Sequence, residues 1–136
     1  MKIADLRLTE RGYTMIEVLI VVTMIVILAS MSMAIYRNSV TAAKEAVLKK
    51  DLFEFHEAID KYYVDRNKYP ADLMALVTDG YIREVPIDPF TNSRDTWQTM
   101  PADPDPNNPA ASIGIFKVAS GSDGIALDGT RYADWK

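Results

Sequence analysis

An uninterrupted apolar segment near the N-terminus constrains this chain more than any other feature. From Val18 to Tyr36 the sequence carries no charged side chain. As an α-helix, the stretch from Tyr13 to Tyr36 would be about 36 Å long, and the hydrocarbon core of a bilayer is about 30 Å thick. The segment can therefore span a membrane. The alternative, a buried core helix, would need a larger protein around it than 136 residues provide.

A short polar leader precedes the apolar segment and ends at Arg11-Gly12. Secretory signals have the reverse order, with an apolar stretch followed by a small-residue cleavage site. Cleavage after Gly12 would therefore leave the apolar segment on the mature chain. Because Arg7 and Arg11 precede that segment, the positive-inside rule places the leader in the cytoplasm and the rest of the chain across the membrane.

Glu17 is the one charged residue between Tyr13 and Tyr36, and two interpretations apply to it. In the local one, Thr14 and Glu17 form a capping box at a helix start. In the intermolecular one, Glu17 faces the new amine of Tyr13 on a neighbouring copy. A carboxylate near the bilayer costs about 2.5–3.5 kcal/mol on insertion scales, so a partner is expected. Both interpretations can hold, and the adjoining Arg-Gly and apolar span favour the second.

Composition excludes several functional classes. The net charge is −4, whereas nucleic-acid binding needs a basic patch. The absence of cysteine excludes disulfides, thiolate metal sites and thiol nucleophiles. His56 is the only histidine, and a lone histidine in a helix is far more often a surface or packing residue than a ligand. No catalytic residues are predicted.

The helical pattern continues beyond the apolar segment. No Gly or Pro occurs between Tyr13 and Arg66, and after Tyr36 apolar residues recur every three or four positions, as on one face of an amphipathic helix. These residues are Tyr36, Val40, Ala43, Val47, Leu48, Leu52, Phe55, Ile59 and Tyr62. We predict one helix of about 50 residues, roughly 80 Å long, whose second half is covered by the rest of the chain.

The remaining residues predict short helices and strands. Asn67–Pro70 ends the long helix, and a short helix over Asp72–Thr78 ends at Gly80. Strands are predicted at Thr96–Met100, Ser112–Ala119 and Arg131–Trp135, with an irregular segment at Tyr81–Phe90 and a proline-rich loop at Pro101–Pro109. In the second strand, one face would hold Ile113, Ile115, Lys117 and Ala119, and the other Gly114, Phe116 and Val118.

The run from Arg11 to Ile20 resembles the class III signal of type IV pilins and type II secretion pseudopilins. The resemblance implies that a prepilin peptidase cuts after Gly12, that Tyr13 is N-methylated where the family usually has Phe, and that Glu17 serves assembly. Many members carry a Gly and a Pro within the apolar helix. Val26 and Ala34 occupy those positions here, so this span is predicted to resist local unwinding.

The soluble part resembles the G-type major pseudopilin of type II secretion. The matching stretches are Lys68–Pro70, Gly80–Arg83, Val85–Phe90, Gly121–Gly124 and Ala133–Trp135. The implied fold is α+β, a long N-terminal helix packed on a small antiparallel sheet. The predicted organisation is a leader at 1–12, a transmembrane and assembly segment at 13–36, and a periplasmic domain at 37–136.

The same resemblance implies a calcium site in the loop Ser122–Gly129. Asp123 is the first candidate ligand and Asp128 the second, and calcium takes six to eight oxygen ligands. The family loop is typically longer and has paired acids near its end, where this chain has only Asp128. The alternative is that both Asp-Gly pairs simply form turns.

The predicted function is that of a pseudopilus subunit that is anchored in the inner membrane, processed, and polymerised into a periplasmic filament for protein export. Its expected partners are copies of itself, prepilin peptidase, the inner-membrane assembly platform and minor pseudopilins. One alternative is a type IV pilin of a surface fibre for adhesion or twitching motility. Another is a membrane-anchored periplasmic binding or enzymatic domain, which would need a cleft with convergent polar groups.

Overall fold

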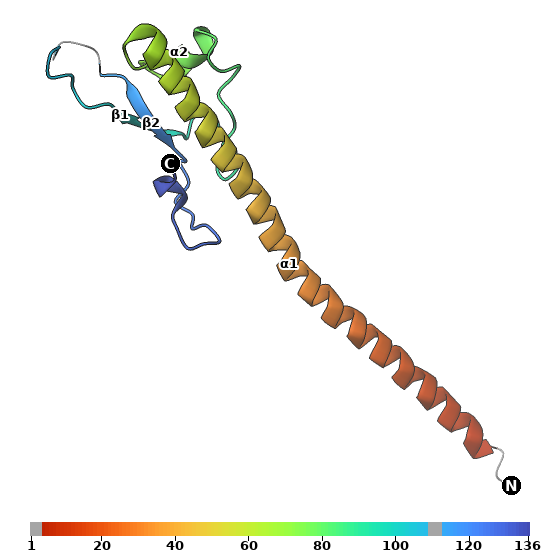
Figure 1. Cartoon of the computed structure of the whole chain (residues 1–136). Coiled ribbons are helices and arrows are strands. Elements are labelled where there is room, and N and C mark those ends of the chain that lie inside the picture. The colour runs from red at the N-terminus through yellow and green to blue at the C-terminus, as the bar shows by residue number, and fades with distance from the viewer. Residues whose placement is uncertain (1–3, 109–112) are drawn as a thin grey trace. The chain divides into compact units, whose positions relative to one another are not determined.

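The computed structural model describes the backbone of residues 4–108 and 113–136 and the side chains of residues 14–108 and 113–136. The fold is α+β, as predicted. In chain order it contains helix α1 (Ala4–Arg66), helix α2 (Leu73–Thr78), strand β1 (Gln98–Pro101), strand β2 (Ile115–Ala119) and the 3-10 helix η1 (Tyr132–Asp134) (Figure 1). The two strands pair in an antiparallel sheet. The chain divides into two units, residues 1–40 and 41–136.

Helix α1 is longer at its start than predicted. It begins at Ala4 and has 63 residues, whereas the sequence pattern placed its first residue at Tyr13. The leader contains good helix formers such as Leu6, Arg7 and Glu10, and the single Gly12 costs only about 1 kcal/mol. Thr14 therefore lies inside α1, where it cannot be the N-cap, since an N-cap has non-helical dihedral angles. The capping-box interpretation of Glu17 is wrong for the uncleaved chain.

The end of α1 and the short helix α2 confirm the predictions for residues 66–80. Asn67 takes a positive φ of 52°, and its amide donates to the Tyr63 carbonyl at 2.8 Å. The carboxylate of Asp72 accepts from the Ala75 amide at 2.7 Å, which is an N-cap bond that satisfies one free amide of α2. Gly80 has a φ of 80°, which favours glycine.

The core lies under the amphipathic half of α1. Leu48, Leu52, Phe55, Ile59 and Tyr62 of the predicted face are buried. They pack with residues from the rest of the domain: Leu76, Trp97, Ile115, Val118, Ala126 and Tyr132. The Phe55 and Trp97 rings meet edge to face, with 5.0 Å between their centroids. This cover is what the one-sided pattern of α1 requires.

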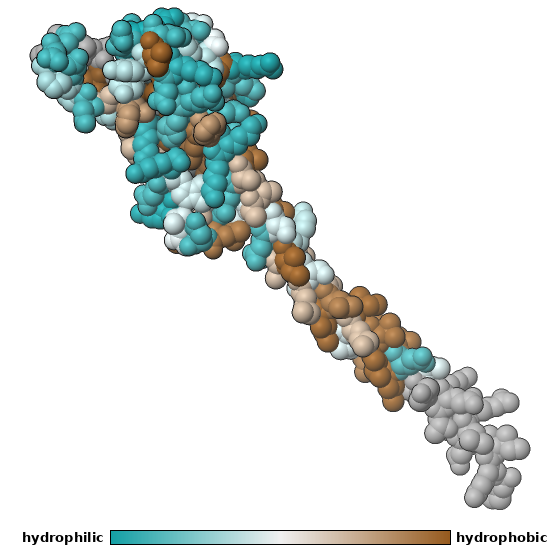
Figure 2. Space-filling model, viewed as in Figure 1, coloured by the Kyte–Doolittle hydropathy of each residue, from teal (hydrophilic) through white to brown (hydrophobic). Residues whose placement is uncertain are grey.

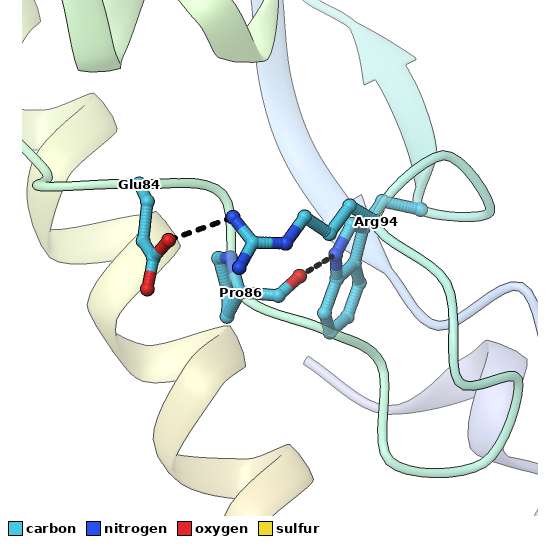
Figure 3. A network of polar contacts seen from close by, with 4 residues as sticks. Glu84, Pro86 and Arg94 are labelled. Atoms are coloured by element: carbon cyan, nitrogen blue, oxygen red, sulfur yellow. Dashed lines mark hydrogen bonds and ion pairs between the residues drawn. The ribbon is translucent and has the colours of Figure 1, made fainter.

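The segment between α2 and β1 has no regular structure and is held by specific polar contacts (Figure 3). The indole nitrogen of Trp97 donates to the Pro86 carbonyl at 2.8 Å. Arg94 pairs with Glu84 at 2.7 Å, but the pair is exposed and contributes little stability. Asp88 is completely buried and accepts from the Ser120 hydroxyl and the Phe90 amide.

Strand β2 forms at Ile115–Ala119, within the predicted strand, whose first residue Ser112 lies outside the described residues. The predicted alternation of its side chains is wrong. Ile115 and Val118 are both buried, although they are three residues apart, and Phe116 is exposed. Met100 pairs with Lys117 and Pro101 with Ile115, so the register skips Phe116. This irregularity is a β-bulge, which adds one residue to a strand and reverses the faces beyond it.

The predicted third strand at Arg131–Trp135 is also wrong. The segment contributes only a single bridge, between Ile125 and Arg131, before it turns into η1. The Tyr132 side chain is buried and stacks on Phe90, with a centroid distance of 3.9 Å. Burial of this ring, together with the turn at Gly129 (φ 86°), bends the backbone away from an extended path.

Candidate functional site

The first candidate site is the surface of α1 before the folded domain. Every side chain from Thr14 to Val40 is exposed, including large apolar residues such as Leu19 and Ile35, at 66% and 68% exposure. Figure 2 shows mainly hydrophobic side chains over this part of α1. The helix is long and apolar enough to cross a membrane. Such a surface requires a lipid or protein environment.

Three hydroxyl groups in the uncharged part of this surface bond back to the helix. Thr23, Ser30 and Ser32 donate to the carbonyls four residues earlier, at 2.7, 2.7 and 2.9 Å. A hydroxyl without a partner would be costly in an apolar environment. These bonds lower the cost of placing Thr23, Ser30 and Ser32 in a bilayer.

The predicted processing and assembly residues lie on consecutive turns of α1. Gly12 and Tyr13 belong to its helical backbone, and the surroundings of their side chains lie outside the described part. Glu17 is exposed, so its carboxylate is open to a partner from another molecule. Its position four residues after Tyr13 places the two residues one turn apart on the same side of the helix.

The second candidate site is the C-terminal loop with Asp123 and Asp128. Both residues are exposed. One oxygen of Asp128 already accepts from the Thr130 amide at 2.9 Å and the Thr130 hydroxyl at 2.6 Å. These bonds, the hydroxyl bond first, lower the pKa of Asp128. The Asp-Gly turn expected as the alternative to a ligand is present here, because an aspartate that accepts from the residue two positions later forms an Asx-turn.

The donor set of this loop fits calcium poorly. Among the residues whose side chains are described, no group of three or more His, Cys, Asp or Glu is placed to hold a metal. Two carboxylates, one of them engaged by Thr130, would leave most of the six to eight calcium ligands to carbonyls and water. Calcium binding by Asp123 and Asp128 stays a prediction.

Sequence reasoning missed two α1 residues that contact the C-terminal segment, Glu45 and Lys49. Glu45 accepts from the Leu127 amide, 82 residues away, and Lys49 lies over the Trp135 ring. In the sequence both look like ordinary solvated charges on the polar side of an amphipathic helix. No local signal marks them, because their partners come from the other end of the chain.

Comparisons with known proteins show the family of the chain. Residues 7–33 match the model described as "Prokaryotic N-terminal methylation motif". Type II secretion system core protein G of Klebsiella michiganensis is 30% identical over an alignment of 145 positions, which covers 95% of each chain. The chain belongs to the core protein G family.

Two other relatives named core protein G match a shorter stretch. The Pectobacterium carotovorum protein is 31% identical over 97 residues, or 60% of this chain and 62% of that protein. The Pseudomonas aeruginosa protein is 31% identical over 102 residues, or 63% of this chain and 72% of that protein. No solved structure matches significantly. Membership identifies the chain as a pseudopilin of the G type, anchored in a membrane by the apolar part of α1.

Proposed function

We propose that this chain is the structural subunit of a type II secretion pseudopilus. The observation that carries the proposal is the exposed apolar surface of α1, which directly follows Arg11-Gly12 and holds Glu17 as its one carboxylate. Prepilin peptidase cuts after Gly12, and the new N-terminus at Tyr13 is methylated. The apolar part of α1 then leaves the lipid and packs against the same segment of other copies.

Glu17 of one subunit pairs with the Tyr13 amine of a neighbouring subunit, and this pair fixes how far the two helices are shifted along each other. At 4 Å and an effective dielectric constant of 20, opposite unit charges attract by about 4 kcal/mol before desolvation is subtracted. Cleavage creates the amine, so the uncut precursor lacks the cation. Processing therefore controls when a subunit becomes able to join the filament.

The folded domain, residues 41–136, lies in the periplasm in this proposal. The precursor is a single-pass inner-membrane protein, and the assembled filament is periplasmic. An assembly platform in the inner membrane adds subunits, minor pseudopilins complete the filament, and growth moves exported proteins outward. The domain supplies the outer surface of that filament.

A structural role is favoured over an enzymatic one. The named relatives are core proteins of a secretion system. Within the described side chains, His56 is part-buried and accepts a hydrogen bond from the Val118 amide, so it is not presented to a substrate. Prepilin peptidase acts on the chain, and the chain itself catalyses nothing in this proposal.

Deletion of the gene tests the proposal against a surface pilin. A pseudopilin mutant fails to secrete proteins across the outer membrane, whereas a pilin mutant loses surface fibres or twitching motility. Complementation with the intact gene is the control. Normal secretion with lost fibres would overturn the proposal, and loss of neither would favour a membrane-anchored binding domain.

A Glu17→Gln variant tests the assembly step. Gln keeps the size of the side chain and removes its charge, so membrane insertion and cleavage after Gly12 should be retained while assembly falls at least about tenfold, the loss expected when about 1.4 kcal/mol of pairing disappears. Cross-linked oligomers in membranes measure assembly, and N-terminal sequencing measures cleavage. An exposed glutamate of the folded domain, Glu57, changed to Gln serves as the matched control.

A further inference from the structure

The C-terminal loop is attached to α1 by one carboxylate. The Oε1 atom of Glu45 accepts from the Leu127 amide at 2.8 Å and from the Tyr132 hydroxyl at 3.0 Å. Leu127 lies in the loop and Tyr132 at the start of η1, so one acceptor joins two parts of the C-terminal segment to the helix. Burial and the hydrogen bond to Glu45 raise the pKa of Tyr132 to about 12.

A positive charge stands one helical turn further along α1. Lys49 Nζ lies 4.6 Å from the centroid of the Trp135 ring, a cation–π contact. Its charge also contributes to the lowered pKa of Asp128, after the two hydrogen bonds from Thr130. The ammonium group therefore favours the charged form of the Asp128 carboxylate.

Hydrogen bonds inside the loop complete its closure. The Thr130 hydroxyl donates to Asp128 and accepts from the Trp135 indole at 2.7 Å. The Ala126 amide donates to the Thr130 carbonyl at 2.7 Å, and the Gly129 amide to the Ala126 carbonyl at 2.9 Å. One carboxylate oxygen of Asp128 and the carbonyls of Ala126 and Thr130 are therefore already bonded within the chain.

We propose that Glu45 and Lys49 of α1 hold the C-terminal loop closed in place of a metal ion, so that the order of this loop does not depend on calcium. Glu45 accepts the hydrogen bonds that fix Leu127 and Tyr132 to the helix, and Lys49 supplies a positive charge near Asp128. The inference goes beyond the pseudopilus proposal and does not depend on it, because every contact lies within residues 41–136 of one chain.

Hydrogen exchange of the Leu127 amide in the full chain, solubilised in detergent, tests the proposal. In the wild type, protection of this amide should be the same in millimolar calcium and in excess EGTA. In Glu45→Ala, its exchange should accelerate at least about tenfold, the scale of one hydrogen bond to a charged acceptor, and calcium should not restore protection. Alanine suits the helix, so α1 itself should be retained.

Three comparisons keep the result interpretable. Glu45→Gln keeps an uncharged acceptor and should give intermediate exchange. Glu57→Ala removes an exposed glutamate of the same helix, paired with Lys61, and should leave Leu127 unchanged. Exchange of the Val118 amide in β2 reports whether the domain remains folded. Loss of Leu127 protection in EGTA in the wild type, or unchanged protection in Glu45→Ala, would overturn the proposal.

Discussion

At the scale of single residues, His56 joins α1 to the sheet. The Val118 amide donates to His56 Nε2 at 3.4 Å, so the ring must be neutral to accept. Burial, followed by the nearby Lys117 of β2, lowers the pKa of His56, and Asp60 of α1 opposes the shift. The sequence pattern argued against a ligand role for His56 but could not predict this hydrogen bond, because the partner amide is 62 residues away.

Acidification should therefore weaken the folded state through His56. Its pKa is lower in the folded chain than the ordinary value of about 6.5, so the unfolded chain binds more protons as the pH falls through that value. The His56 contribution is complete above about pH 7 and declines below it. Chemical denaturation between about pH 7.5 and 5.5 measures this, and His56→Gln, which keeps an acceptor, should have a shallower slope. Equal slopes for the two proteins would contradict the expectation.

The buried pair of Asp88 and Ser120 makes a second residue-level prediction. Ser120→Ala removes one of the donors to a carboxylate that has no exposure to water. A lost hydrogen bond to a buried charged group costs about 1.5–3 kcal/mol, so the free energy of unfolding should fall by that amount. Ser122→Ala, which affects a part-buried bond to the Gly124 amide, is the matched control. Equal losses from both variants would assign the effect to the loop as a whole.

At the scale of elements, the helices were predictable and the sheet was only partly so. Helical signals are local, such as the three-and-four spacing of Leu48, Leu52 and Phe55, the cap at Asp72 and the stop at Gly80. Strand β2 has a local apolar signal, but its faces depend on the bulge at Phe116, which is defined by pairing with β1. Similarly, the turn into η1 at Tyr132 depends on stacking with Phe90, which is distant in sequence.

Helix α1 is expected to stay helical between Val26 and Ala34 in the filament. It has no Gly or Pro there, and Ser30 and Ser32 bond back to the helix. Ala34→Pro would remove an amide donor and cost about 3 kcal/mol. Amide exchange at residues 30–33 in detergent should accelerate in that variant and stay slow in the wild type and in Ala34→Leu. A filament map with unwound backbone in the wild-type segment would contradict the expectation.

At the scale of the whole molecule, the two units differ in the exposure of their apolar side chains. Residues 41–136 contain the whole described core, from Leu48 to Tyr132. The described side chains before residue 41 are all exposed. The apolar side chains of the first unit therefore need lipid or another protein around them. The core side chains of the second unit are buried by that unit itself.

A fragment of residues 41–136 should therefore fold without the apolar segment. We expect it to be soluble and to melt within a few degrees of the full chain in detergent, as followed by the fluorescence of Trp97 and Trp135. A shorter fragment of residues 51–136 loses the buried Leu48 together with Glu45 and Lys49. Loss of one buried leucine alone costs about 2–5 kcal/mol, so this fragment should be much less stable. Similar stability of the two fragments would show that the helix before Asp51 adds nothing to the core.

The edges of the sheet that packs on α1 are poorly suited to pairing with strands of other chains. Open strand edges can template pairing with further chains, and proteins block them with bulges, prolines or a covering element. On β2, the Ile115 amide donates to the Pro70 carbonyl at 2.8 Å and the Val118 amide to His56, so neither is available to an incoming strand. β1 is four residues long and ends at Pro101, which has no N–H. These features limit the pairing of the sheet with a strand from another chain.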